Sequence, residues 1–355
     1  MSDRAMVGKM ARRPEQRVPD YQRRKRIGYG LLFVVLGIYT FITLVPFYFT
    51  VIRAFVPTDR ATQVHLWIPE PRPLSMQAQV GNFATYYSID LRDFKAAMGI
   101  EGFLPPYTSL QQLIDEYGVG EEEIRSYLRP YTTYAGWYSM LKNSRFWTAL
   151  YGNVVVAVVS VLLGGILGIM TGSVLARLRK RWHRIIYNSY LLSMVIPPIA
   201  IMIPVYMIFS QYLNLTNSYW NLILMFAKGD ALSIMLFTTY IASIPASLKE
   251  SVQMDGGNRL HYLTSIVFPL SVTPFAVFMS IRLPWFWNDL IFGYLFLSPE
   301  KQTLMPYINA FAGTYTTNYQ AIYAGLILAI APLILLYLVF RRLFVRAALA
   351  GAVKY

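Results

Sequence analysis

The chain has 355 residues, of which 55% are hydrophobic and 14% are charged, yet its formal net charge is +14. About 25% charged residues is usual for soluble proteins, so this composition excludes an ordinary soluble enzyme. A nucleic-acid-binding protein would not be this apolar. The absence of cysteine excludes disulfides and thiolate sites, and three widely separated histidines argue against a histidine metal cluster. The combination predicts a membrane protein with several spans and its positive charge collected on one side.

Long stretches without charged residues identify the spans, because a helix of about 20 apolar residues crosses the hydrocarbon. The predicted spans are residues 28–52, 146–176, 185–209, 225–244, 265–288 and 320–341. The expected fold class is therefore an all-α membrane protein with six transmembrane helices. A cleaved signal peptide fits poorly, since the first apolar stretch is too long and further spans follow.

The basic residues orient these spans. Residues 1–27 hold nine Lys or Arg against three Asp or Glu, residues 177–184 five against none, and residues 341–355 four against none. Residues 53–145 hold nine against ten. Because positive loops stay cytoplasmic, both termini are expected inside, in an inner (plasma) membrane. The basic tail then lies beside anionic lipid, so membrane lipid and not nucleic acid is its expected partner.

The chain divides accordingly into five parts. They are a basic cytoplasmic tail (1–27), the first span (28–52), an extracytoplasmic insertion (53–145), a core of five spans (146–341) and a cytoplasmic C-terminal tail (342–355). Within the insertion, residues 109–128 predict two short helices around Gly118 and Gly120, with acidic residues in the second helix's first turn. We expect a small ordered subdomain there; a spacer of marginal stability is the alternative.

One cytoplasmic loop has no positive excess. Residues 245–264 hold two basic and two acidic residues. Pro245 suits a first helical turn, Gly256 and Gly257 would end that helix because glycine accepts positive φ, and Asn258 can cap a second helix. The loop therefore predicts a helix, a glycine turn and a second helix at the cytoplasmic face, an element that can dock into a partner's groove.

Four residues of this loop, continued to residue 269, are spaced as in the cytoplasmic EAA signature of ABC-importer permeases: Glu250, Asp255, Gly256 and Pro269. Ser251 and Val252 stand in place of its alanines, and Gly257 in place of a third small residue. Other segments resemble the maltose-type sugar permeases, the smaller of the two membrane subunits: Asn153, residues 174–179, 194–209, 287–289, 297–306 and 351–354. The resemblance covers roughly residues 140–355 plus the first span, and it fails over most of 53–145.

The resemblance implies a second, larger maltose-type permease subunit, two ABC ATPase subunits and an extracytoplasmic sugar-binding protein as partners. The 245–269 loop would couple to the ATPase through Glu250, Ser251, Val252, Asp255, Gly256 and Gly257. An external loop would contact the binding protein and displace its sugar through Phe311, Gly313, Thr314 and Tyr315, with a plain flexible turn as the alternative. The chain lacks the phosphate-binding G-x-x-x-x-G-K-[ST] loop. ATP and magnesium are therefore expected to bind to the partner subunits. This chain is expected to bind no cofactor and to catalyse no reaction.

Three residues near the fifth span are candidates for the translocation path: Arg282, Trp287 and Asn288. An intramembrane charge such as Arg282 usually faces a cavity or a partner, although it could instead snorkel to the outer interface. Tryptophans such as Trp220 and Trp285 are assigned to interfacial belts or the core rather than to sugar contacts. The Pro197–Pro198 pair predicts a kink.

The predicted function is that of a permease subunit in an ATP-driven importer of an oligosaccharide, such as maltose, trehalose or another α-glucoside. One alternative is an ion-coupled secondary transporter, which would need intramembrane carboxylates or inverted repeats. Another is an ABC permease for a solute that is not a sugar.

Overall fold

The regular structure of the chain is helical. In the computed structural model, the part of the chain described contains α-, 3-10 and π-helical segments and two isolated β-bridges, without a β-strand. The described residues are 19–60, 63–69, 75–87, 89–178, 180–229, 231–313 and 317–352. The prediction of an all-α protein is confirmed.

The first helix, α1 (Pro19–Arg53), contains the first predicted span. Its apolar part, Ile27–Arg53, is long enough to cross a membrane. The chain up to Thr50 forms one compact unit, and Val51–Tyr355 forms another. All elements below belong to the second unit.

The insertion folds as short helices around a hydrophobic core of its own. Its elements are η1 (Thr58–Arg60), α2 (Val80–Tyr87), α3 (Leu91–Ala97), α4 (Leu110–Tyr117) and the first part of α5 (Glu121–Leu141). A reciprocal capping box starts α4: the Ser109 hydroxyl accepts from the amide of Gln112, whose side-chain oxygen accepts from the amide of Ser109. Gly118, at φ +68°, ends it. The helix on each side of Gly118 and Gly120 is therefore confirmed, but the second is not short: it continues past residue 128 to Leu141.

The insertion also contains an internal repeat. The pair α2–α3 and the pair α4–α5 place buried apolar residues at the same positions, 30 residues apart: Val80 and Leu110, Ile89 and Val119, Phe94 and Ile124, Met98 and Leu128. The equivalent residues Gln79 and Ser109 form an antiparallel bridge. Antiparallel pairing of equivalent residues relates the two units by an approximate two-fold axis, and each unit covers the apolar face of the other.

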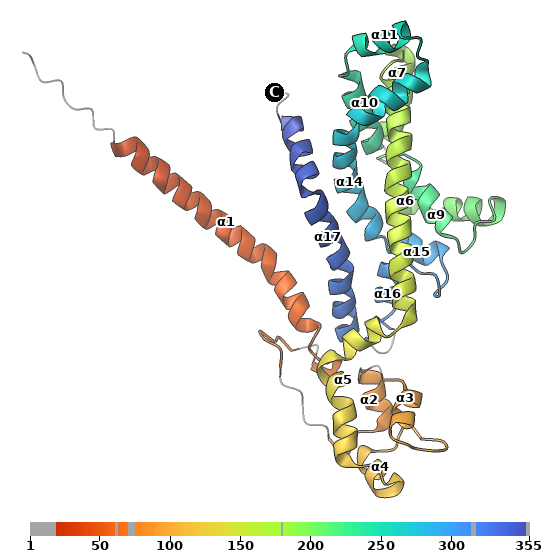
Figure 1. The fold of residues 1–355 in the computed structure, drawn as a ribbon. Helices are drawn as coiled ribbons and strands as arrows, with labels where there is room; N and C mark the ends of the chain where they lie inside the picture. The colour runs from red at the N-terminus through yellow and green to blue at the C-terminus, as the bar shows by residue number, and fades with distance from the viewer. Residues whose placement is uncertain are drawn as a thin grey trace, which may run out of the picture. The chain divides into compact units, whose positions relative to one another are not determined.

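Helix α5 belongs to two cores. Ile124 and Leu128, near its start, lie in the core of the insertion, whereas Met140, near its end, is fully buried in the core of the helical bundle. The later turns of α5 pack against α17 (Tyr319–Ala352), and the amide of Gly136 donates to the side-chain oxygen of Gln320 at 3.3 Å. The same helix therefore fixes the insertion to the bundle (Figure 1).

The bundle is built around α6 (Ser144–Leu175). This helix packs against α9 (Tyr219–Ala227), α10 (Ala231–Ala242) and α14 (Val272–Trp287), and α14 also packs against α17 (Figure 1). Small residues on α6 allow the close approach that membrane helices use in place of hydrophobic driving force. A Cβ atom on Gly172 would lie only 2.9 Å from the Cβ atom of Phe237 and 3.0 Å from the amide nitrogen of Thr238, so only glycine fits this crossing.

The third and fifth predicted spans are broken helices. Residues 185–209 contain the end of α7 (Lys180–Leu192), a break, η2 (Pro198–Ile201), α8 (Met202–Met207) and the start of η3 (Ile208–Tyr212). In the fifth, Arg259–Leu270 and Val272–Trp287 meet at a bend of 64°. The fourth predicted span falls on a second bent pair, Tyr219–Ala227 and Ala231–Ala242, which meet at 46°. By length and composition, three described helices can cross a membrane, or up to five if each bent pair counts as one span. The six-span count stays a prediction.

Short elements complete the bundle between and beyond these helices. They are α11 (Ala246–Met254), α12 (Arg259–Tyr262), η4 (Leu263–Val267), α13 (Phe268–Leu270), α15 (Ile291–Phe296) and α16 (Leu304–Asn309).

Candidate functional site

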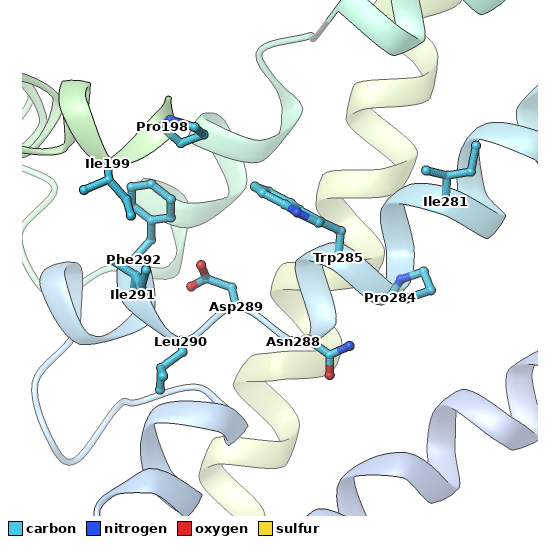
Figure 2. Close-up of a pocket in the computed structure, with 10 residues that line it drawn as sticks. All are labelled: Pro198, Ile199, Ile281, Pro284, Trp285, Asn288, Asp289, Leu290, Ile291 and Phe292. Atoms are coloured by element: carbon cyan, nitrogen blue, oxygen red, sulfur yellow. The ribbon is translucent and has the colours of Figure 1, made fainter. Parts of the chain in front are cut away.

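A cavity of about 660 Å³ lies where the end of α14 and the start of α15 face the proline break before α8. Its walls are mostly apolar, and the polar groups among them come from Trp285, Asn288 and Asp289. The lining residues are Pro198, Ile199, Ile281, Pro284, Trp285, Asn288, Asp289, Leu290, Ile291 and Phe292 (Figure 2). A few polar groups in an apolar cavity of about 300–1,000 Å³ are typical of small-molecule sites.

The Asp289 carboxylate is positioned by the first turn of α15. Its Oδ2 accepts a hydrogen bond from the amide of Gly293 at 2.8 Å. Figure 2 shows the carboxylate and the Trp285 ring extending toward Pro198 and Ile199, while the Asn288 amide points away from the carboxylate. The cavity therefore combines an oriented acceptor with an aromatic ring.

Trp287 lies in a different environment from its neighbours. It is 4% exposed, its indole Nε1 donates to the carbonyl of Ala329 in α17 at 3.1 Å, and its own carbonyl accepts from Asn153 Nδ2 at 3.3 Å. Asn153 Oδ1 accepts in turn from the amide of Leu304 at 3.3 Å. Trp287 is thus packed among α6, α14 and α17 and does not line the cavity, whereas its neighbour Asn288 does.

Arg282 lines a second cavity, of about 330 Å³. Lys228 and Gly229, which follow α9, line this cavity too. The Arg282 side chain is half-buried, and its guanidinium carbon lies 5.7 Å from the centroid of the Trp285 ring. This contact is a cation–π interaction within the usual limit of about 6 Å.

In the 245–269 loop, α11 follows Pro245 and ends at Met254. Gly256 turns the chain at φ +77°, and the Asn258 side chain caps α12 by accepting from the amide of His261 at 2.9 Å. A Cβ atom on Gly257 would lie 2.6 Å from Val252 Cγ1 and 2.8 Å from the Val252 carbonyl oxygen. The turn therefore requires glycine at both positions, for backbone conformation at the first and for space at the second.

The predicted coupling residues of this loop divide into a buried and an exposed set. Val252 is buried, while the side chains of Glu250, Ser251 and Asp255 are exposed. Behind the loop, Tyr262 is buried and accepts a hydrogen bond from Arg177 Nη2, at the end of α6, at 2.9 Å. The exposed carboxylates are thus carried on an element that is tied to the central helix.

The external loop is described only in part. Phe311 is half-buried and makes an edge contact with Tyr307, with the ring centroids 5.6 Å apart. Its carbonyl accepts from the amide of Asn318 at 2.9 Å, and Gly313 is exposed. Thr314 and Tyr315 lie outside the described residues.

The sequence interpretation did not assign Trp285 and Asp289 to a site. A signal for Trp285 exists in the spacing, because residues 281, 284, 285 and 288 recur at helical intervals and so share one face of α14 and its C-cap. All four positions line the larger cavity. The abundance of tryptophan at membrane interfaces favoured the other assignment.

Comparison with known proteins gives consistent matches over the bundle. A family described as "Binding-protein-dependent transport system inner membrane component" matches residues 164–349. The chain is 31% identical over 209 residues to the probable starch degradation products transport system permease protein AmyC of Thermoanaerobacterium thermosulfurigenes, covering 58% of this chain and 75% of that protein. It is 30% identical over 179 residues to the multiple sugar-binding transport system permease protein MsmG of Streptococcus mutans, covering 50% and 64%.

One solved structure matches along nearly the whole chain. It is a chain of a bacterial ABC transporter involved in the import of the acidic polysaccharide alginate, with a TM-score of 0.61 and 18% identity over 90% of this chain and 97% of that one. At this identity the match shows a shared fold. The insertion lies outside the residues that the family matches.

Proposed function

The chain belongs to the family of binding-protein-dependent transport system inner membrane components and is a permease subunit of the sugar-uptake type. We therefore propose that it forms half of the translocation path of an ATP-driven oligosaccharide importer. The other half would be a second, larger maltose-type permease subunit. Two ATPase subunits, which bind ATP and magnesium, would supply the energy, and an extracytoplasmic binding protein would supply the sugar.

The proposed solute is a short oligosaccharide. The relatives AmyC and MsmG carry names that refer to starch degradation products and to multiple sugars. A maltose- or trehalose-type α-glucoside is the first class to test, because the motifs of residues 287–289 and 297–306 resemble those of the maltose-type permeases.

The protein is an integral membrane protein with several spans, and we place both termini in the cytoplasm. The basic residues of 1–27 and 341–355 support this orientation. The six-span count belongs to the proposal as well, with the broken segment after α7 as the third span. Residues 53–145 would then lie outside.

The observation that carries the coupling proposal is the projecting α11–turn–α12 element. It presents Glu250 and Asp255 to the surroundings while Val252 anchors it to the bundle core. An exposed carboxylate on a short helix suits a groove that offers arginine side chains or backbone amides, and such contacts are strong when the groove excludes water. Gly256 and Gly257 would set the angle at which this helix meets the ATPase. Phe311, Gly313, Thr314 and Tyr315 would contact the binding protein.

The test is purification of the chain from membranes in mild detergent, followed by identification of what co-purifies and reconstitution into liposomes. The expected result is a second permease with an ATPase pair, and uptake of maltotriose that requires ATP and the binding protein. Uptake that needs no ATPase and stops when an ionophore collapses the sodium or proton gradient would overturn the proposal.

A further inference from the structure

The two cavities beside α14 share a wall. Trp285 and Pro198 line both the cavity of about 660 Å³ and the cavity of about 330 Å³. One indole ring, opposite one proline ring, therefore stands between a space that carries Asp289 and a space that carries Arg282. Trp285 can therefore be reached from either space.

The Trp285 ring is held on one side and open on another. The Arg282 guanidinium carbon lies 5.7 Å from its centroid, and Phe226 and Phe286 make edge contacts with it at centroid distances of 5.9 and 5.8 Å. These neighbours fix the ring plane, yet the residue is 47% exposed. Trp285 is therefore accessible at the cavity wall, whereas Trp287, at 4% exposure, is covered by core packing.

The cavity that carries this ring also contains an oriented acceptor. Asp289 Oδ2 accepts from the Gly293 amide at 2.8 Å, and a carboxylate offers about four acceptor sites, so it keeps capacity for a ligand's donors. Asn288 also lines this cavity, but its amide points away from the carboxylate (Figure 2). An acyl chain would bring no donor to the half-buried carboxylate, whereas a ligand with hydroxyl groups would.

We propose that Trp285 is a stacking platform for one sugar ring of a neutral oligosaccharide and that Asp289 accepts hydrogen bonds from that ring's hydroxyl groups. A pyranose ring has an apolar C–H face and a rim of hydroxyl donors. The first matches the electron-rich face of an indole, and the second matches a carboxylate. The site rests on the proposed function, because the sugar would reach it along the translocation path, with Trp285 separating one ring position from the next.

The first test uses the absence of native cysteine from this chain. Ile291→Cys places a thiol on the cavity wall, and Tyr294→Cys places one on the same helix away from it; the native residues are 44% and 42% exposed. The complete importer in liposomes, with binding protein and ATP, is treated with a maleimide with and without maltotriose. Maltotriose should slow labelling of I291C and leave Y294C unchanged. Equal labelling of I291C with and without the sugar overturns the assignment.

The second test compares uptake with ATP hydrolysis in the same importer. Asp289→Asn should reduce the apparent affinity for maltotriose in uptake roughly ten- to a hundredfold. Trp285→Ala should reduce it about tenfold, with partial recovery in W285F, while binding-protein-stimulated ATP hydrolysis persists. The matched control is Trp220→Ala, because Trp220 is 52% exposed and lines neither cavity.

The outcomes separate the two proposals. A wild-type importer that carries maltotriose while W285A and W220A behave alike overturns this inference alone. A wild-type importer that carries no oligosaccharide overturns the proposed function and this site with it. If the W285A or D289N chain fails to assemble, the labelling of I291C still decides the question.

Discussion

Asn153 offers a quantitative test of how the bundle is held together. Its side chain is 2% exposed, donates to the Trp287 carbonyl and accepts from the Leu304 amide, both at 3.3 Å. Asn153→Leu keeps the volume and leaves two buried backbone groups without partners. Each such group costs about 1–3 kcal/mol. Because both hydrogen bonds are long, we expect the lower part of the sum, about 2–4 kcal/mol of unfolding free energy.

The assay is unfolding of the purified chain in mixed micelles as the SDS fraction rises, followed by tryptophan fluorescence. Ser160→Ala is the matched control, because Ser160 is fully buried on the same helix and its hydroxyl has no hydrogen-bond partner in the described part of the chain. The control should change stability by less than about 1 kcal/mol. If N153L lowers the unfolding free energy no more than S160A does, the hydrogen bonds that join α6, α14 and α16 do not contribute to stability as argued.

Three further predictions concern the loops. Glu250→Ala should leave the complex assembled and lower sugar-stimulated ATP hydrolysis at least about tenfold, since a truncated charge contact costs about 2–5 kcal/mol; unchanged stimulation, equal to that of the exposed-site control Gln253→Ala, would contradict it. Gly257→Ala places a methyl group 2.6 Å from Val252 Cγ1 and should open the turn at a cost of about 1–3 kcal/mol, with the same loss of stimulation; wild-type ATPase activity would refute the steric argument. Deleting residues 313–316 should abolish uptake without changing the subunits that co-purify, and normal uptake would end the binding-protein contact proposal.

Local features of the sequence were the easiest to predict. Pro245, Gly256 and Asn258 act on their own backbone, through a fixed φ, a permitted positive φ and a short side-chain acceptor, so their effect does not depend on distant residues. The same holds for Gly118, which ends α4 at φ +68°. The all-helical class followed from charge-poor stretches for an equally direct reason.

Bends and cavities could not be predicted in the same way. The prolines at 197 and 198 are visible in the sequence, but how far the helix breaks there depends on what its neighbours can satisfy, and the structure ends α7 already at Leu192. Trp285 and Trp287 have the same side chain two residues apart, yet one lines two cavities and the other is buried against α17. Only the placement of the surrounding helices separates them.

The insertion shows a third limit. Its 30-residue repeat is present in the sequence, but the residues that recur are apolar side chains of different types, such as Phe94 and Ile124. A repeat of this kind is defined by burial rather than identity. The repeat is therefore recognised from the hydrophobic core that both units share and not from the sequence alone.

Because α5 contributes to both hydrophobic cores, the stabilities of the insertion and of the bundle end are linked. A partner that binds the insertion and stabilises folded α5 also stabilises the packing of α5 against α17. The reverse holds as well, because such linkage is reciprocal. A change in the bundle that loosens Met140 should therefore appear as faster proteolysis or amide exchange around Ile124 and Leu128. Proteolysis or amide exchange measured in the insertion would therefore report on the conformation of the helical bundle.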